Sequence, residues 1–175
     1  MTRGELEHAI RAVCDLTGDT EIWIFGSQAI LGQFPMAPAS LRQSAECDVA
    51  PKNRLEKLDL IDGTLGELSQ FHETHGFYVH GVSLDAATLP NGWHERVIEV
   101  RNENTRQNTG LCIEAHDLAA SKLVAFRDKD RSFARVLLVE RLIEPDVLLT
   151  RIESLPCDAE RKNRLVEWVE ATIRD

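Results

Sequence analysis

The sequence predicts an α+β domain with a helical C-terminal part. Short apolar runs bounded by glycine and proline, which are typical of strands, concentrate before residue 115. From Asp117 onward, apolar residues recur instead at helical spacing. Hydrophobic residues make up 43% of the 175 residues, which is enough for a substantial core. We therefore expect an α/β core over residues 1–115 and a helical part over residues 116–175, packed as a single compact unit.

The first third of the chain alternates between helical and extended patterns. Residues 5–16 carry apolar side chains at helical spacing, and LTGDT ends the predicted helix. Residues 21–25 are typical of a buried strand, and residues 27–32 of a short helix that follows directly. GQFPMAPAS contains two prolines and a glycine and indicates a loop. AECDVAP favours a short strand that ends before Pro51.

The middle of the chain predicts one helical stretch and three further strands. Residues 53–75 have a mainly helical pattern, with Gly63 and Gly66 as candidate interruptions. Strands are expected over 76–82, 96–100 and 111–114. TLPNGW is a turn signal between the first two of these strands.

The helical part is expected to begin at Asp117, a residue type suited to capping a helix N-terminus. Two or three more helices follow the first one, the last over about residues 158–173.

Charge and cysteine usage narrow the functional class. The formal net charge is −9, which disfavours broad, non-specific coating of DNA, because that binding requires a basic surface. The stretch KLVAFRDKDRSFAR, residues 122–135, is nevertheless locally basic. The four cysteines form no close pair, so we expect buried, reduced thiols in a cytoplasmic protein. No apolar run approaches the length of a membrane span, and the N-terminus has no secretory pattern.

The stretch IFGSQAI, residues 24–30, is the first candidate site. A glycine that ends a buried strand allows a ligand to approach the backbone closely, and the hydroxyl of Ser27 can bond a phosphate oxygen. The alternative is that Ser27 only caps the following helix. The stretch is neither a P-loop nor a dinucleotide-binding fingerprint.

Glu46 and Asp48 form the second candidate site. On a strand they project from the same face, while Cys47 and Val49 face the other way. Two such carboxylates can converge on one or two hard cations, because Mg²⁺ prefers oxygen ligands. The alternative is an edge strand with a solvated polar face.

A basic group near residue 125 forms the third candidate site, made of Lys122, Arg127 and Lys129 with Asp130 beside them. Positions 122 and 129 fall on nearly the same side of one helix, and such a face can neutralise a triphosphate. The alternative is a solvated helix face with local pairs such as Arg127–Asp130. His72 and His75 are interpreted as surface residues, because no third metal ligand accompanies them.

Taken in order, IFGSQAI, SAECDVAP and HDLAASKLVAFRDKD resemble the nucleotidyltransferase (DNA polymerase beta-like) superfamily. The resemblance covers roughly residues 20–140. It extends to the minimal bacterial AbiEii and MenT toxin-like group and its small uncharacterised relatives, which GVSLDAATLPNGWHERV also resembles. It implies a mixed β-sheet flanked by helices. It also implies a reaction in which an acceptor hydroxyl attacks the α-phosphate of an NTP and releases pyrophosphate.

The resemblance also implies roles for single residues. Gly26 and Ser27 would contact the nucleotide phosphates, and Glu46 and Asp48 would bind Mg²⁺ or Mn²⁺. Lys122 would contact the phosphates, assisted by Arg127 and Lys129, and Asp130 would support the catalytic centre. The acceptor would be an RNA 3′ end, a protein or a small molecule, and a cognate toxin or antitoxin would be a partner.

The sequence departs from the superfamily pattern at three points. The loop between Ser27 and Glu46 is long, and the first acid is glutamate. His80 stands on the strand where many of these enzymes carry a third carboxylate, and Asp85 lies past the end of that strand. The alternative function is therefore a catalytically degenerate protein that binds nucleotides or serves as an interaction module.

Overall fold

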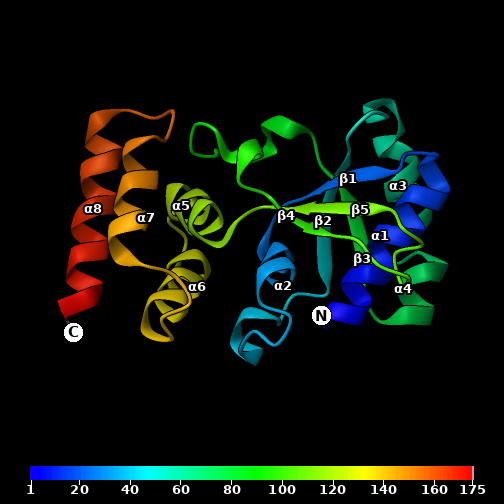
Figure 1. Ribbon diagram of the computed structural model, residues 1–175, viewed down its shortest axis with the longest axis horizontal. Helices are drawn as coiled ribbons and strands as arrows, with labels where there is room; N and C mark the ends of the chain where they lie inside the picture. Colours follow the sequence, from blue (N-terminus) through cyan, green and yellow to red (C-terminus); the bar gives the residue numbers. More distant parts are fainter. Residues whose placement is uncertain (175) are drawn as a thin grey trace. The chain divides into compact units, whose positions relative to one another are not determined.

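The computed structural model describes residues 1–174 (Figure 1). These residues pack into two compact units. The sheet unit consists of residues 1–86 and 97–113, and the helical unit consists of residues 87–96 and 114–174. The segment 87–96 thus belongs to the helical unit although residues of the sheet unit flank it on both sides.

The sheet unit contains a five-stranded mixed sheet in the order β3-β2-β1-β5-β4. Its strands are β1 (Glu21–Ile24), β2 (Glu46–Pro51), β3 (Tyr78–Gly81), β4 (Ile98–Val100) and β5 (Thr109–Cys112). β1 pairs antiparallel with β2 and parallel with β5, while β3 pairs parallel with β2 and β4 antiparallel with β5. This confirms the predicted mixed sheet.

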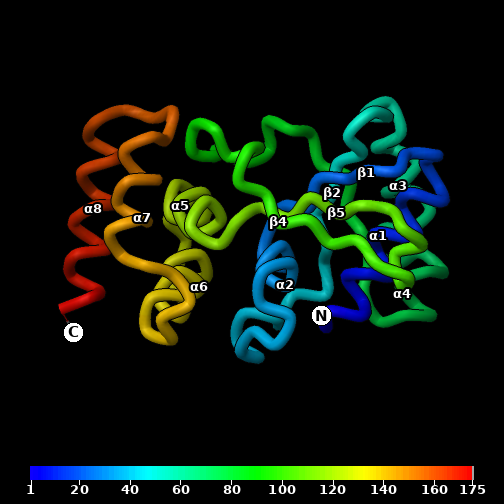
Figure 2. The backbone as a smooth tube through the Cα atoms, viewed as in Figure 1, coloured from blue at the N-terminus to red at the C-terminus, as the bar shows by residue number. Residues whose placement is uncertain are grey.

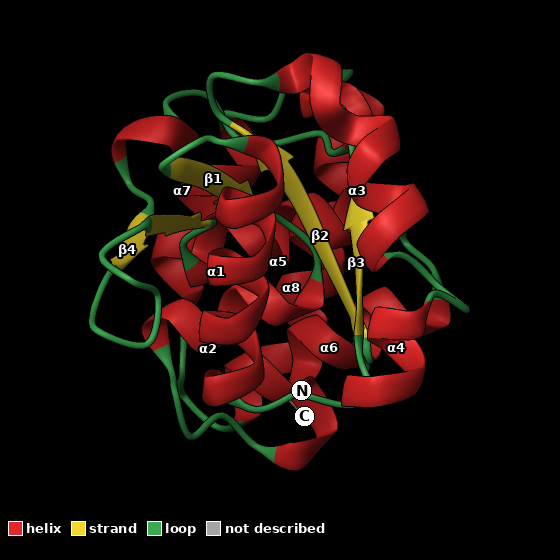
Figure 3. Ribbon diagram, turned by 90° about the vertical axis from the view of Figure 1, so that its right-hand side faces the viewer, coloured by secondary structure: helices red, strands yellow, loops and turns green. Residues whose placement is uncertain are grey.

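Four helices accompany the sheet: α1 (Arg3–Thr17), α2 (Ile30–Gln33), α3 (Leu58–Leu65) and α4 (Gln70–His75). α1 begins at a capping box formed by Thr2 and Glu5 and ends at Gly18 in the left-handed conformation. Its apolar face, which includes Leu6 and Ile10, is fully buried, so its helical periodicity predicted the core correctly. Figure 3 shows α3 close to β3, at the same edge of the sheet.

One candidate interruption in the sheet unit is confirmed, and one strand boundary differs from the prediction. The helical stretch 53–75 is interrupted at Gly66, whereas Gly63 lies within α3. A Cβ atom at Gly66 would meet the Asp62 carbonyl oxygen at 2.2 Å. β2 continues through Pro51, which pairs with Ile22, whereas the strand was expected to end before it. Proline is tolerated at the end of a strand because only one ladder donor is lost there.

The helical unit contains α5 (Ala115–Ala125), α6 (Asp128–Val139), α7 (Pro145–Glu153) and α8 (Ala159–Arg174). α7 and α8 run side by side, as the backbone trace in Figure 2 shows. The unit is held by a core of leucine side chains that are essentially excluded from solvent: Leu123, Leu137, Leu148, Leu155 and Leu165. Together the two units confirm the α+β class with a helical C-terminal part.

Asp117 does not cap α5, contrary to the prediction. The cap is Glu114, whose carboxylate accepts hydrogen bonds from the backbone N–H groups of His116 and Asp117. Asp117 is fully buried and accepts two bonds from Arg96, at 2.8 and 2.9 Å. Arg151 Nε lies 3.1 Å from the same carboxylate, without the alignment of a hydrogen bond. The helix therefore begins earlier than expected, and Asp117 becomes the centre of a buried ion cluster.

All four cysteines are free thiols. Cys14, Cys47 and Cys112 are buried as predicted, whereas Cys157 is partly exposed. Burial raises the pKa of Cys14 and of Cys112 to about 12 and raises the pKa of Cys47 well above its ordinary value. Among the described helices, none has the length and apolar character needed to cross a membrane.

Candidate active site

β2 places Glu46 and Asp48 on one face of the sheet. The side chains of Cys47 and Val49 between and after them are fully buried, while Glu46 and Asp48 remain accessible. This alternation confirms that both carboxylates share one face. The strand therefore presents two oxygen donors to solvent from a rigid element.

β3 brings His80 beside the two carboxylates. In the parallel pair β2–β3, which Figure 3 shows side by side, Asp48 stands opposite His80. His80 Nδ1 lies 3.1 Å from Asp48 Oδ1 and 3.3 Å from Glu46 Oε1. One ligand atom from each of the three residues falls within 4.8 Å of the others, a spacing at which they could hold one metal ion. Asp85 lies beyond the end of β3, as expected.

Gly26 packs directly against Asp48. Its backbone, with φ 62° and ψ −171°, occupies a region that essentially only glycine populates. A Cβ atom at Gly26 would lie 2.2 Å from Asp48 Oδ2, and the neighbouring Phe25 N–H donates to the Asp48 carbonyl at 2.9 Å. The glycine predicted at the strand end is thus in contact with the predicted acidic strand.

Ser27 begins a short 3-10 helix, Ser27–Ala29, and does not cap it. The cap position is Gly26, and no side-chain hydrogen bond closes this helix end. The interpretation of Ser27 as a helix cap is therefore wrong. Its place, next to the glycine that contacts Asp48, is consistent with a binding role.

Gln28 is a residue that the sequence patterns did not single out. It follows Ser27, is fully buried, and its amide oxygen and nitrogen have no hydrogen-bond partner among the described residues. Unsatisfied amides of this kind are uncommon in folded proteins, because each costs desolvation free energy. Neither helical periodicity nor a motif marks such a residue, because the signal exists only in the packed structure.

The electrostatic field around the carboxylates is negative. The pKa of Tyr78, which stands opposite Glu46 in the sheet, is raised by burial first and then by the charges of Glu46, Glu67 and Asp48. The charges of Glu46, Glu67 and Asp48, unlike burial, also favour a cation at this face. The acidic face thus has the charge that a divalent metal ion requires.

In the helical unit, the structure brings Lys122, Arg127 and Asp130 together. The Asp130 carboxylate is buried, with Arg127 Nε at 2.6 Å and Lys122 Nζ at 3.8 Å. This confirms the expected local pair Arg127–Asp130. Lys122 Nζ also lies 4.7 Å from the centre of the Phe133 ring, and its side chain is only 14% exposed.

Lys122 and Lys129 do not share one helix face, contrary to the prediction. α5 ends at Ala125, Phe126 adopts the left-handed conformation with φ 53°, and α6 begins at Asp128. The two lysines therefore belong to different helices. The guanidinium carbons of Arg131 and Arg164 lie 4.8 and 4.1 Å from the centre of the Phe126 ring.

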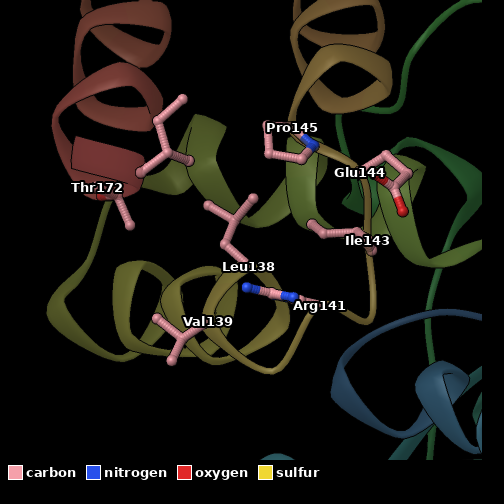
Figure 4. Close-up of a pocket in the computed structure, with 8 residues that line it drawn as sticks. Leu138, Val139, Arg141, Ile143, Glu144, Pro145 and Thr172 are labelled. Atoms are coloured by element: carbon pink, nitrogen blue, oxygen red, sulfur yellow. The ribbon is translucent and has the colours of Figure 1, made fainter. Parts of the chain in front are cut away.

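A separate hollow of about 590 Å³ lies within the helical unit (Figure 4). Its wall combines apolar and polar surface, with Arg141 and Glu144 as its charged members, and its lining residues include Leu138, Ile143, Pro145 and Thr172. None of the predicted site residues lines it. The candidate chemistry therefore remains with the acidic face of the sheet unit.

Comparison with protein families bears on this site. A family model described as "Nucleotidyltransferase of unknown function (DUF6036)" matches residues 4–172, which is almost the whole chain. No curated protein and no solved structure matches the chain.

Proposed function

The chain belongs to this family of nucleotidyltransferases of unknown function, and we propose that it moves an NMP from an NTP to an acceptor hydroxyl in a metal-dependent reaction. The observation that carries the proposal is the contact of Gly26 with Asp48 on the face shared by Glu46 and His80. A strand-end glycine beside paired carboxylates combines access to the backbone with donors for a metal ion.

The donor set fits a divalent metal ion, with Glu46 and Asp48 as the residues that would hold Mg²⁺ or Mn²⁺. Both side chains are accessible, belong to one rigid strand and lie in a negative field. When bound, such an ion supplies positive charge that offsets the charge of the triphosphate. Any side chain at position 26 would collide with the Asp48 carboxylate. Glycine therefore leaves the space that this carboxylate occupies.

The other site residues would position and neutralise the nucleotide. Ser27 offers a hydroxyl donor to a phosphate oxygen beside the acidic face. Lys122, Arg127 and Lys129 would contact the phosphates. Asp130 lies within 3.8 Å of Lys122 Nζ and holds Arg127 by a short bond, so it would orient these cations. Positioning and charge neutralisation are the main demands of phosphoryl-type transfer.

The acceptor and the biological partner belong to the same proposal. The locally basic segment 122–135 favours an RNA 3′ end over a protein hydroxyl or a small molecule, because the RNA backbone is anionic. The resemblance to the AbiEii and MenT toxin-like group supports a role in a toxin–antitoxin pair, with a cognate partner protein.

The proposal is tested by transfer of label. The full chain is incubated with each α-labelled NTP, Mg²⁺ or Mn²⁺, and either total RNA or cell lysate. We expect one NTP to label an acceptor, and Asp48→Asn to reduce the rate about 100-fold or more, because even residues behind metal ligands contribute about 10- to 100-fold. Asp59→Asn, an exposed acid on α3 in the same unit, is the matched control. Equal labelling by the wild type and Asp48→Asn would refute the enzyme assignment.

A degenerate, nucleotide-binding protein is the second candidate. The observation that favours it is His80, which stands where a third carboxylate would serve as the base for the acceptor hydroxyl. Calorimetry separates the two functions. NTP binding of equal affinity with and without metal, and no pyrophosphate release, would identify a binding module.

A further inference from the structure

His80 has the placement of a metal ligand. Its Nδ1 atom is 3.1 Å from Asp48 Oδ1 and 3.3 Å from Glu46 Oε1. Two neighbouring ligand atoms on an octahedral ion, with bonds of about 2.1–2.2 Å, lie about 3.0–3.1 Å apart. The imidazole nitrogen and the two carboxylate oxygens therefore have nearly the separations that a shared ion imposes on its ligands.

The backbone fixes this position of His80. The Val82 N–H donates to the Val49 carbonyl at 2.9 Å, which holds the register of β3 against β2. The Gly81 N–H donates to Asp62 Oδ1 at 2.7 Å, and a side chain at Gly81 would meet the Leu58 carbonyl at 2.8 Å. β3 is thus pinned between β2 and α3, and its residue 80 cannot turn away from the acids without breaking the pairing.

A simpler role for His80 would be that of a counter-ion to the two carboxylates. The side chains of His80, Glu46 and Asp48 are 48%, 38% and 27% exposed. Ion pairs this accessible to water contribute little to stability. A convergent set of one nitrogen and two oxygens that remains open to solvent is more typical of a metal site that binds substrate.

The nitrogen donor changes which ion the site selects. Mg²⁺ takes oxygen ligands almost exclusively, whereas imidazole nitrogen is a ligand for first-row transition metals. A neutral imidazole that bonds a metal through Nδ1 keeps its proton on Nε2. We propose that Glu46, Asp48 and His80 form a mixed oxygen–nitrogen site that selects a first-row transition-metal dication over Mg²⁺. This inference rests on the proposed function, because the ion is the one that the transfer reaction would use.

The test measures metal binding directly on the full chain after chelator treatment. Binding of Mn²⁺ is followed by the loss of the free-ion electron paramagnetic resonance signal, and Mg²⁺ is added as the competitor. Pulsed measurements on bound Mn²⁺ detect coupling to a histidine nitrogen. His80→Asp restores a three-carboxylate set, and His94→Asp serves as the control, because the His94 side chain is 58% exposed and pairs locally with Glu95.

We expect nitrogen coupling in the wild type and in His94→Asp, and none in His80→Asp. The preference for Mn²⁺ over Mg²⁺ should fall at least about tenfold in His80→Asp, because even the partners of metal ligands contribute about 10- to 100-fold in affinity. Bound Mn²⁺ without nitrogen coupling in the wild type overturns the inference, and so does an unchanged preference in a folded His80→Asp variant. If His80→Asp does not fold, the wild type alone decides: nitrogen coupling to bound Mn²⁺ supports the inference, and its absence overturns it.

The outcomes separate this inference from the proposed function. NMP transfer together with Mn²⁺ binding that lacks nitrogen coupling would keep the enzyme and discard the role of His80. Nitrogen-coupled Mn²⁺ without transfer of any NTP label would keep the metal site and discard the enzyme. A chain that binds no Mn²⁺ refutes the mixed-ligand site.

Discussion

At the scale of single residues, the site depends on a position that has no side chain. Gly26 combines a glycine-only backbone conformation with a neighbour, Asp48 Oδ2, that leaves no room for a Cβ atom. The same residue lies just after β1 and directly precedes the short 3-10 helix that begins at Ser27. The conformation of Gly26 and the position of the Asp48 carboxylate, the proposed metal ligand, therefore depend on each other.

Replacing Gly26 should impair metal binding at the site more than it lowers the stability of the fold. We expect Gly26→Ala to cost about 1–3 kcal/mol in free energy of unfolding, which is typical of such backbone conformations. It should also weaken Mn²⁺ binding, because the new methyl group displaces Asp48. Urea denaturation and the Mn²⁺ titration measure the two effects.

Gly76→Ala is the matched control for this substitution. Gly76 has φ 74° and ends α4, but a Cβ atom there meets nothing within 4 Å. Its replacement should cost about 1–2 kcal/mol and leave Mn²⁺ binding intact. Unchanged Mn²⁺ affinity in Gly26→Ala would contradict the proposed constraint.

Much of this residue-level detail was predictable, and some was not. Strand alternation predicted that Glu46 and Asp48 share one face, and the position of His80 on the next predicted strand identified it as a residue of interest. The pairing of β1 with β2 brought Gly26 against Asp48, and that contact depends on a register that no local pattern specifies. The unsatisfied amide of Gln28 depends on burial in the same way.

At the scale of elements, the N-terminal half of α5 is organised by a buried charge. Asp117 is fully buried between Arg96, from the segment before β4, and Arg151, from α7. Three segments that are distant in sequence thus converge on one carboxylate. An aspartate near a helix start looks like a cap in sequence, and only the positions of the two arginines reveal its other role.

Removing this charge should destabilise the helical unit. We expect Asp117→Asn to lower the free energy of unfolding by about 3–5 kcal/mol, because it leaves the guanidinium groups of Arg96 and Arg151 without their buried partner. Asp128→Asn is the control, since the Asp128 side chain is 94% exposed and its pair with Arg131 should be worth less than about 1 kcal/mol. Urea midpoints that match between the two variants would refute the central role of Asp117.

The break between α5 and α6 shows the limit of periodicity at this scale. The apolar pattern runs across Phe126 without a glycine or proline, and sequence therefore predicts one continuous face. The left-handed conformation of Phe126 is rare for a bulky residue, and tertiary contacts such as stacking with Arg131 and Arg164 accompany it. Local propensity does not contain this information.

At the scale of the whole molecule, the chain passes between the two units three times, after residues 86, 96 and 113. The helical unit therefore cannot be completed by the C-terminal residues alone, because it includes the segment 87–96. The predicted division into residues 1–115 and 116–175 does not account for that segment. The packing of both units as one compact body remains a prediction.

This interleaving should make unfolding cooperative. Trp23 reports on the sheet unit, while Trp93 and Trp168 report on the helical unit. We expect Trp23→Phe and the double variant Trp93→Phe/Trp168→Phe to show coincident urea transitions by fluorescence, each compared with circular dichroism of the same variant. Transitions separated in midpoint within one variant would show instead that the units unfold independently.

The unequal burial of the cysteines makes it possible to measure how the two units are arranged in solution. The thiolate is the reactive form of cysteine, and pKa values of about 12 leave almost none of it at Cys14 or Cys112 near neutral pH. Cys47 is fully buried with a pKa raised well above its ordinary value, whereas Cys157 is partly exposed between α7 and α8. The native chain thus carries one natural attachment point for a dye. In the double variant that retains only Trp23 as a donor, energy transfer from Trp23 to that dye would report changes in the distance between the sheet unit and the helical unit as nucleotide is added.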